Sequence, residues 1–236
     1  MWSSVQSQLR EPSLSSADDP RPATGQALVG GLLLACGVIG PPVNIAVFTV
    51  EGALRPEYSP IRDFTSFLSL GPYGWVNVAN FIVLGLLMTA FAAGVRTVIR
   101  TGPAAPAGPI VIAVSGLGLI AAGVFVADPG PNAVTVHGSL HIAASIVFLA
   151  AMTAACFVVA AHYDLANGRR FAAYSRVTGV AFAGLFTADL LVGVGIAGLL
   201  QRIGILVICS WIVLLAVRLI QEGAMGSPTA KEADET

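Results

Sequence analysis

Residues 133–161 read AVTVHGSLHIAASIVFLAAMTAACFVVAA, and this stretch decides the fold class. From Ile142 to Ala161 it contains no charged side chain. A helix needs about 20 consecutive apolar residues to cross the hydrocarbon core of a bilayer. The stretch therefore predicts a membrane-spanning helix. It also holds two histidines near its start, His137 and His141.

Five further apolar stretches of similar length are separated by Pro, Gly or charged residues. In lipid, a backbone must satisfy its own hydrogen bonds, and the short alternating strands of a barrel are absent, so each stretch is expected to be helical. The sequence thus predicts an all-α, six-span transmembrane domain over residues 26–220. The six expected spans are Gln26–Val50, Tyr73–Val95, Gly108–Val126, Ala133–Ala161, Val177–Leu200 and Ile203–Leu219.

The composition agrees with a membrane protein. Of the 236 residues, 56% are hydrophobic and 11% are charged, and the mean hydropathy is +0.81. A formal net charge of -1 offers no basic surplus for a nucleic-acid backbone, which excludes that class of partner. The three cysteines lie in apolar stretches and are interpreted as small hydrophobic residues. Residues 1–25 and 221–236 are mixed polar segments, expected to be disordered cytoplasmic tails.

Positive charges predict the orientation. If both termini are cytoplasmic, nine of the twelve Lys and Arg residues lie on the cytoplasmic side and three, Arg55, Arg62 and Arg202, lie outside. This bias follows the positive-inside rule. We expect a multi-pass protein of the plasma membrane with both ends inside the cell.

Polar residues gather in two loops that this orientation places outside, residues 51–75 and 127–141. Any chemistry is expected there. Asn44, Asn77 and Asn80 lie in the outer thirds of the first two spans. They either extend the polar patch or form hydrogen bonds between helices.

His137 and His141 are four residues apart, so a helix places both rings on one face. One helix can supply two imidazoles to a metal at this spacing, as in HExxH, although the Glu is missing here. We expect zinc as the metal, with a third ligand from Asp63, Asp128 or Asp189. The alternative is that the histidines hydrogen-bond to neighbouring helices at the membrane interface.

Asp63 and Asp189 are the candidate catalytic carboxylates, because metal catalysis needs one near a bound water. Asp189 is expected roughly ten residues below the outer end of the fifth span, where a carboxylate costs about 2.5–3.5 kcal/mol. That cost predicts either a functional role or a neutral carboxyl that hydrogen-bonds to an adjacent helix. The alternative for Asp128 is a structural turn with Pro129. For Asp63, or for Ser59 before it, the alternative is the cap of a short surface helix.

Four short motifs carry a family resemblance: SPIRDFTS (59–66), GPYGW (71–75), ADPGP (127–131) and HGSLH (137–141). With them the chain resembles domain of unknown function 998, a family of bacterial and archaeal polytopic membrane proteins, over roughly residues 30–219. The resemblance implies a membrane topology and brings no established activity.

Two wider resemblances concern lipids and zinc. An Asp-bearing first outer loop, a Gly-rich third span and a His at the head of the fourth are similar to the eukaryotic six-span proteins of GPI-anchor lipid remodelling and autophagy modulation. The HxxxH pair is similar to the seven-span alkaline ceramidases and progestin-type receptors, which hold zinc with His and Asp. This chain lacks their seventh span and third histidine. Resemblance at the level of a fold does not assign a function.

The first hypothesis is a membrane protein with an outward-facing His and Asp pocket that binds a lipid or another amphiphile. In its enzymatic form the protein is a metal-dependent hydrolase. The alternative is a non-enzymatic carrier, a membrane-organising protein or an accessory subunit of a membrane complex. Metal content distinguishes them, because a carrier needs none.

Overall fold

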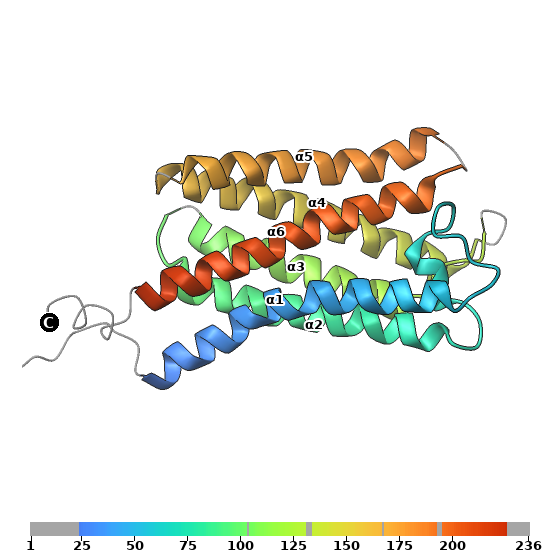
Figure 1. Cartoon of the computed structure of the whole chain (residues 1–236), viewed down its shortest axis with the longest axis horizontal. Coiled ribbons are helices and arrows are strands. Elements are labelled where there is room, and N and C mark those ends of the chain that lie inside the picture. Colours follow the sequence, from blue (N-terminus) through green and yellow to red (C-terminus); the bar gives the residue numbers. More distant parts are fainter. Residues whose placement is uncertain (1–23, 103, 131–133, 167, 193–194, 226–236) are drawn as a thin grey trace, which may run out of the picture.

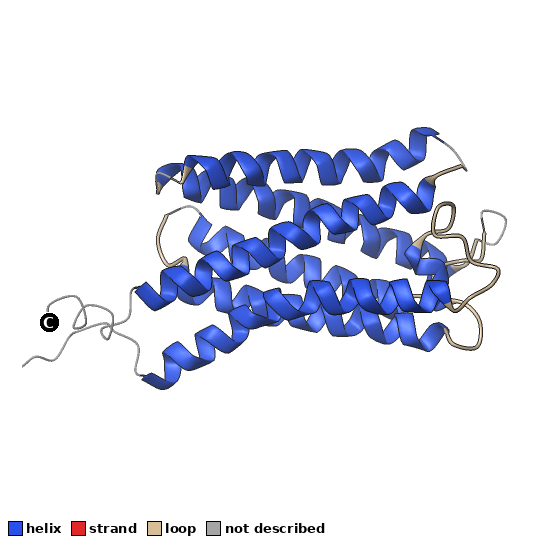
Figure 2. Cartoon of the chain, viewed as in Figure 1, coloured by secondary structure: helices blue, strands red, loops and turns tan. Residues whose placement is uncertain are grey.

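The computed structural model describes residues 24–102, 104–130, 134–166, 168–192 and 195–225. This part of the chain is built of helices, with no strand (Figure 1, Figure 2). The predicted all-α fold class is confirmed. In chain order the elements are α1 (Thr24–Ala53), the short 3-10 helix η1 (Thr65–Ser69), α2 (Gly74–Val98), α3 (Ala104–Val124), α4 (Val136–Leu165), α5 (Arg169–Val192) and α6 (Ala197–Met225).

Five of the helices, α1, α2, α3, α4 and α6, are long and apolar enough to cross a membrane. By this criterion the protein is a multi-pass membrane protein. Within the described residues α5 is not among these five. The count of six spans therefore stays a prediction.

The helices are arranged as a closed ring. Each packs against its neighbours in the sequence, and α1 also packs against α6. The start of α1 and the end of α6 lie at the same end of the bundle, which we call the termini end (Figure 1). The helix η1 lies at the opposite end, which we call the η1 end.

Glycines allow neighbouring helices to approach closely. A Cβ on Gly116 of α3 would lie 2.7 Å from the carbonyl oxygen of Gly85 in α2. A Cβ on Gly118 would lie 3.0 Å from the backbone nitrogen of Phe148 in α4. Contacts of small residues stabilise helix association in lipid, where apolar burial alone gives little preference for protein over lipid.

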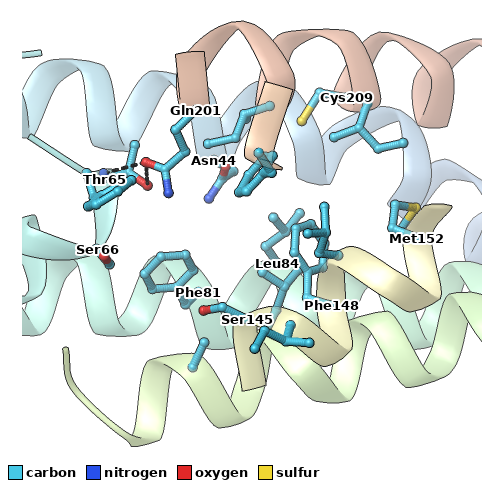
Figure 3. A pocket seen from close by; sticks show the side chains of 18 of the residues that line it. Asn44, Thr65, Ser66, Phe81, Leu84, Ser145, Phe148, Met152, Gln201 and Cys209 are labelled. Atoms are coloured by element: carbon cyan, nitrogen blue, oxygen red, sulfur yellow. Dashed lines mark hydrogen bonds between the residues drawn. The ribbon is translucent and has the colours of Figure 1, made fainter. Parts of the chain in front are cut away.

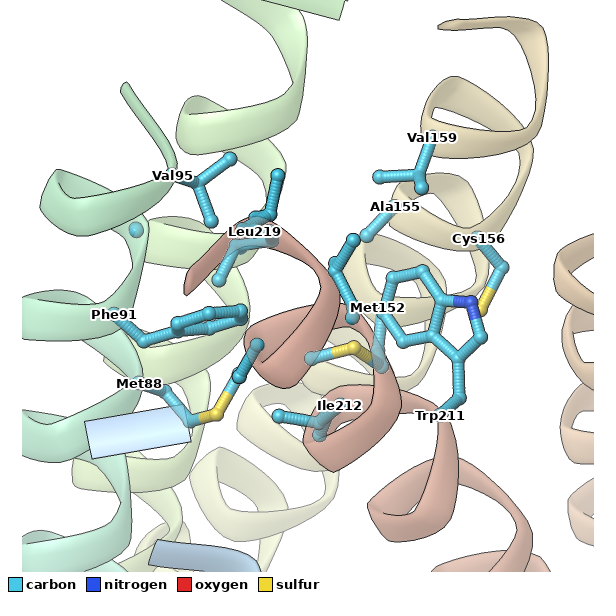
Figure 4. Packing of buried hydrophobic residues seen from close by; sticks show 14 of the residues in the cluster. Met88, Phe91, Val95, Met152, Ala155, Cys156, Val159, Trp211, Ile212 and Leu219 are labelled. Carbon is cyan, nitrogen blue, oxygen red and sulfur yellow. The ribbon is translucent and has the colours of Figure 1, made fainter. Parts of the chain in front are cut away.

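The apolar core lies toward the termini end. Its large buried side chains include Phe91 of α2, Met152 of α4 and Trp211 of α6 (Figure 4). Phe182, near the middle of α5, is also fully buried. The Trp211 indole N–H donates to the hydroxyl of Ser175 on α5 at 2.9 Å, which satisfies the only polar group of this side chain. The core fills the ring at the termini end and leaves space for a cavity toward the η1 end.

The predicted position of the fifth helix is wrong by about two turns. The helix begins and ends eight residues earlier than expected, at Arg169 and Val192. Apolar residues continue on both sides of the turn, so hydropathy does not mark the break between α5 and α6. The arginines in the first two turns indicate a loop by their charge, yet long side chains of this type can reach the membrane interface from a helix.

The expected tails lie mostly outside the described residues. Residues 1–23 and 226–236 are not described. The helix α6 continues through Met225, five residues beyond the expected end of the transmembrane domain at 220.

Candidate functional site

The loop of residues 54–73 is held at the η1 end by Arg202 of α6. The Arg202 guanidinium donates to the backbone carbonyls of Pro60 at 2.6 Å and Asp63 at 3.0 Å. It also donates to the hydroxyl of Tyr58 and lies 5.3 Å from the centre of that ring. Burial raises the pKa of Tyr58, and Arg202 acts in the opposite direction, so the phenol is protonated at neutral pH. One arginine thus ties the loop to α6 through neutral oxygen atoms.

Two further residues of α6 contact this loop. The side-chain oxygen of Gln201 accepts hydrogen bonds from the backbone N–H of Thr65 at 2.8 Å and from its hydroxyl at 3.1 Å. Gly198 packs directly on the backbone of Asp63, because a Cβ at this glycine would overlap the Asp63 carbonyl group. The start of α6 therefore fixes the position of η1.

The loop is also anchored to its own neighbours. The amide of Asn77 in α2 donates to the carbonyl of Thr65 at 2.8 Å and to the hydroxyl of Ser69 at 3.0 Å. Arg55 donates to the carbonyl of Leu70 at 2.7 Å and, through its other terminal nitrogen, to Glu51. With these bonds η1 becomes a fixed cover at its end of the ring.

A cavity of about 350 Å³ lies inside the ring below this cover (Figure 3). All six helices and η1 contribute to its wall. Most of the lining is apolar, with side chains such as Leu84, Phe148 and Ile208. The volume falls within the range of about 300–1,000 Å³ typical of small-molecule sites.

Polar side chains line the cavity near the η1 end, among them Asn44 of α1, Ser66 of η1, and His141 and Ser145 of α4. The Asn44, Ser66 and His141 residues are only 6%, 8% and 6% exposed. Within the described part of the chain, neither the amide of Asn44 nor the hydroxyl of Ser66 has a hydrogen-bond partner. Neither group is among the described atoms that are fully buried without a partner, so both are accessible from the cavity. Polar groups that face a cavity without a protein partner indicate a place for a ligand or water.

The two histidines, expected to act together, have different surroundings. His141 Nδ1 lies 2.8 Å from the carbonyl oxygens of Ala122 and Phe125 in and after α3. Because both neighbours are acceptors, Nδ1 carries the proton, and in the neutral ring Nε2 is an acceptor. His137 is exposed and packs edge-on to the Phe125 ring, with centroids 5.7 Å apart. His141 thus forms the interhelical hydrogen bond that was the alternative to a metal site.

The carboxylate of Asp128 stabilises the turn before α4. It accepts hydrogen bonds from the Thr135 hydroxyl at 2.6 Å and from the Thr135 backbone N–H at 3.0 Å. These two bonds lower the pKa of Asp128. Thr135 in turn caps α4 by accepting from the N–H of Gly138. These bonds give Asp128 a structural role at the start of α4, in line with the structural alternative, while the expected turn with Pro129 stays a prediction.

The carboxylate of Asp63 also closes a turn, accepting the backbone N–H of Ser59 at 2.6 Å. A short helix follows, as expected, but its cap residue is Phe64, without a side-chain hydrogen bond. The cap predicted at Ser59 or Asp63 is therefore wrong. The Asp63 side chain does not line the cavity among the described residues.

Asp189 lies three residues before the end of α5, nearer the helix end than the ten residues expected. The shift follows from the corrected position of that helix. Its side chain lies outside the described residues.

Among the described residues, no group of three His, Cys, Asp or Glu side chains could hold a metal ion. The zinc site at His137, His141 and Asp128 stays a prediction, as do the catalytic roles of Asp63 and Asp189. Of these residues, His141 alone lines the cavity in the described part.

A family model described as protein of unknown function, DUF998, matches residues 38–218. The chain belongs to this family. No curated protein and no solved structure matches the chain. Membership of DUF998 confirms the resemblance carried by the four motifs. Three of them now have a structural place: SPIRDFTS forms the loop bound by α6, ADPGP contains the Asp128 turn, and HGSLH begins α4.

The sequence did not identify Gln201 and Arg202 as residues of the site, whereas Asn44 was one of three asparagines expected to extend the polar patch or to bond between helices. Arg202 was counted only as a charge in an outer loop. A signal was present, because Gln201 and Arg202 are adjacent polar residues between two long apolar runs. Such residues in a membrane helix usually face other parts of the protein.

Proposed function

We propose that this DUF998 protein crosses the plasma membrane six times, with its η1 end outside and both termini in the cytoplasm. The helix α5 has 24 residues, or about 36 Å at 1.5 Å per residue, which is enough to span. It packs against α4 and α6, two helices apolar enough to cross. The charge bias toward the termini end supports the orientation.

In this membrane the cavity binds an amphiphile. The observation that carries the proposal is the division of its lining, with polar side chains near the η1 end and mostly apolar side chains elsewhere (Figure 3). A molecule with a polar head and an apolar tail matches both parts. The tail would point toward Met152 and the core, and the head toward Asn44 and Ser66.

Binding without chemistry, as in a carrier or a lipid-organising protein, fits the described residues better than hydrolysis. The carboxylates of Asp63 and Asp128 accept hydrogen bonds within their own turns. A zinc-dependent hydrolase is the second candidate because of one observation. His141 has its Nδ1 fixed by backbone carbonyls, as zinc-ligating histidines do, and this leaves Nε2 to act as a ligand.

Quenching of Trp211 tests the binding. The indole of Trp211 lies beside Met152, which lines the apolar end of the cavity (Figure 4). Replacing Trp2 and Trp75 with Phe leaves Trp211 as the single reporter among the three tryptophans. In lipid nanodiscs, a long-chain alcohol brominated at the end of its chain should quench Trp211 saturably.

A matched pair of variants provides the control. Ser145→Phe fills the cavity and should abolish the saturable quenching, whereas Ala150→Phe, on the exposed face of the same helix, should retain it. If quenching rises linearly with the concentration of the brominated alcohol, without saturation, and is equal in both variants, the result would contradict the proposal.

A further inference from the structure

The wall of the cavity reaches the lipid-facing surface at one place. Among its described lining residues, only Ile142 and Ile146 of α4 and Thr187 of α5 are exposed. The two isoleucines are 60% and 58% exposed. All three lie in the halves of α4 and α5 nearer the η1 end. The lining residues on α1, α2, α3 and α6 are buried or partly buried.

The contacts of α4 and α5 explain the opening. Near the middle of the bundle the two helices pack together, with the rings of Phe148 and Phe182 5.9 Å apart, and slightly closer to the termini end Gly179 packs against Cys156. Toward the η1 end, α4 is bound to α3 through His141.

In the same half of the bundle, α5 leans on α6 instead. A Cβ on Gly204 of α6 would lie 3.0 Å from the Phe186 ring of α5. As a result, α4 and α5 diverge toward the η1 end in Figure 1. Because α4 is bound to α3 and α5 packs against α6, the separation of α4 from α5 at this end is a consequence of how the ring packs.

We infer that the ligand enters from the outer half of the membrane between α4 and α5, and that it is an amphiphile with an uncharged, hydroxyl-bearing head. This inference rests on the proposed binding function and adds to it a route and a chemical class. We call the gap lined by Ile142, Ile146 and Thr187 the lateral opening.

The chemistry of the head follows from the groups at the polar end. Asn44 offers an amide that can donate and accept, Ser66 a hydroxyl that can do both, and His141 Nε2 an acceptor. A hydroxyl can pair with each of these groups. The nearby cations, Arg55 and Arg202, do not line the cavity and are bound to loop carbonyls. An anionic head would therefore meet no arginine or lysine among the described lining residues, and burying its charge is costly.

The rate of exchange tests the lateral opening. In the single-Trp211 protein, the double variant Ile146→Phe with Thr187→Phe narrows the opening. Val114→Phe with Leu117→Phe, on the exposed face of α3, is the matched control. Nanodiscs loaded with the brominated alcohol are mixed with empty vesicles, and the recovery of Trp211 fluorescence is followed. The opening variant should release the alcohol about tenfold more slowly at similar affinity, because an obstructed path slows entry and exit alike.

The outcomes separate the two proposals. Normal exchange in the opening variant, with saturable binding intact, would overturn the lateral route and leave the cavity as the binding site. Absence of saturable binding in the unblocked protein would overturn both.

A comparison of head groups tests the ligand class. A brominated alcohol should bind about tenfold more tightly than the carboxylate of equal chain length, and equal or tighter binding of the carboxylate would overturn the assignment. Asn44→Leu should weaken binding of the alcohol about tenfold while the thermal stability of the empty protein stays equal or rises, because it removes a buried amide without a partner. Unaltered binding in this variant would contradict a role for Asn44 in recognising the head.

Discussion

The side-chain oxygen of Gln201 accepts both the backbone N–H and the hydroxyl of Thr65, and so joins residues that are 136 positions apart. Replacing Gln201 with Leu leaves a half-buried N–H and a buried hydroxyl without their partner, at a cost of about 1–3 kcal/mol. We expect lower thermal stability in nanodiscs and weaker binding of the brominated alcohol. Gln221→Leu, an exposed glutamine of the same helix, is the control and should change neither. Equal melting temperatures of the two variants would show that η1 does not depend on Gln201.

Gly198 provides a steric test of the same contact. Gly198→Ala places a methyl group on the Asp63 carbonyl, where the obstacle is backbone that cannot move without displacing the loop. The expected result is a loss of about 1–3 kcal/mol of stability. Gly184→Ala in α5, where a Cβ meets nothing within 4 Å, should be neutral or stabilising because Ala favours the helix. If both substitutions behave alike, the contact between α6 and the loop carries little of the stability.

Labelling of single cysteines tests the six-span topology. We choose Glu57 in the loop at the η1 end, Ala166 between α4 and α5, and Gly195 between α5 and α6, all of which are exposed. An impermeant maleimide added to intact cells should label Glu57→Cys and Gly195→Cys but leave Ala166→Cys unlabelled until the cells are permeabilised. The positions Ala166 and Gly195 flank α5 and show whether this helix crosses the membrane. Labelling of both from outside would mean that it does not cross.

The pKa of Asp128 predicts how stability depends on pH. The pKa is lower in the folded protein than its ordinary value of about 3.9, so the carboxylate stabilises the fold above that value. The contribution is lost as the pH falls through the lower folded pKa. Asp128→Asn should therefore lower the melting temperature at pH 7 and differ less from the native protein at about pH 3. Thr135→Val removes the hydroxyl that donates to Asp128 and accepts from the Gly138 N–H, whereas its backbone N–H still donates to Asp128. The double variant should therefore lose less than the sum of the two single losses, because the hydroxyl bond to Asp128 is counted in both. A difference that does not shrink at low pH would contradict this role of the carboxylate.

The number and type of helices were predictable from sequence because lipid leaves the backbone few alternatives. The break between α5 and α6 was not, since apolar residues continue through it and hydropathy has no minimum there. Spacing correctly indicated that His137 and His141 begin the same helix. It did not reveal that α3 covers one ring and leaves the other exposed. The contacts of Gln201 with Thr65 and of Arg202 with the loop join residues more than a hundred positions apart, and no local pattern encodes such pairs.

The histidines allow the zinc hypothesis to be separated from hydrogen bonding between helices. If His137 and His141 share zinc, protein purified without chelators should contain about one zinc per chain, and His137→Ala or His141→Ala should each lose it. We expect the two variants to differ instead. His141→Ala removes the donor to the carbonyls of Ala122 and Phe125 and should cost about 1–3 kcal/mol, whereas His137→Ala removes an exposed ring and should cost less than about 0.5 kcal/mol. Both histidines contact Phe125, His141 at its carbonyl and His137 at its ring, so the double variant should depart from additivity by no more than a contact through this one residue allows. Stoichiometric zinc that disappears in both single variants would instead establish a metal site and favour the hydrolase over the carrier.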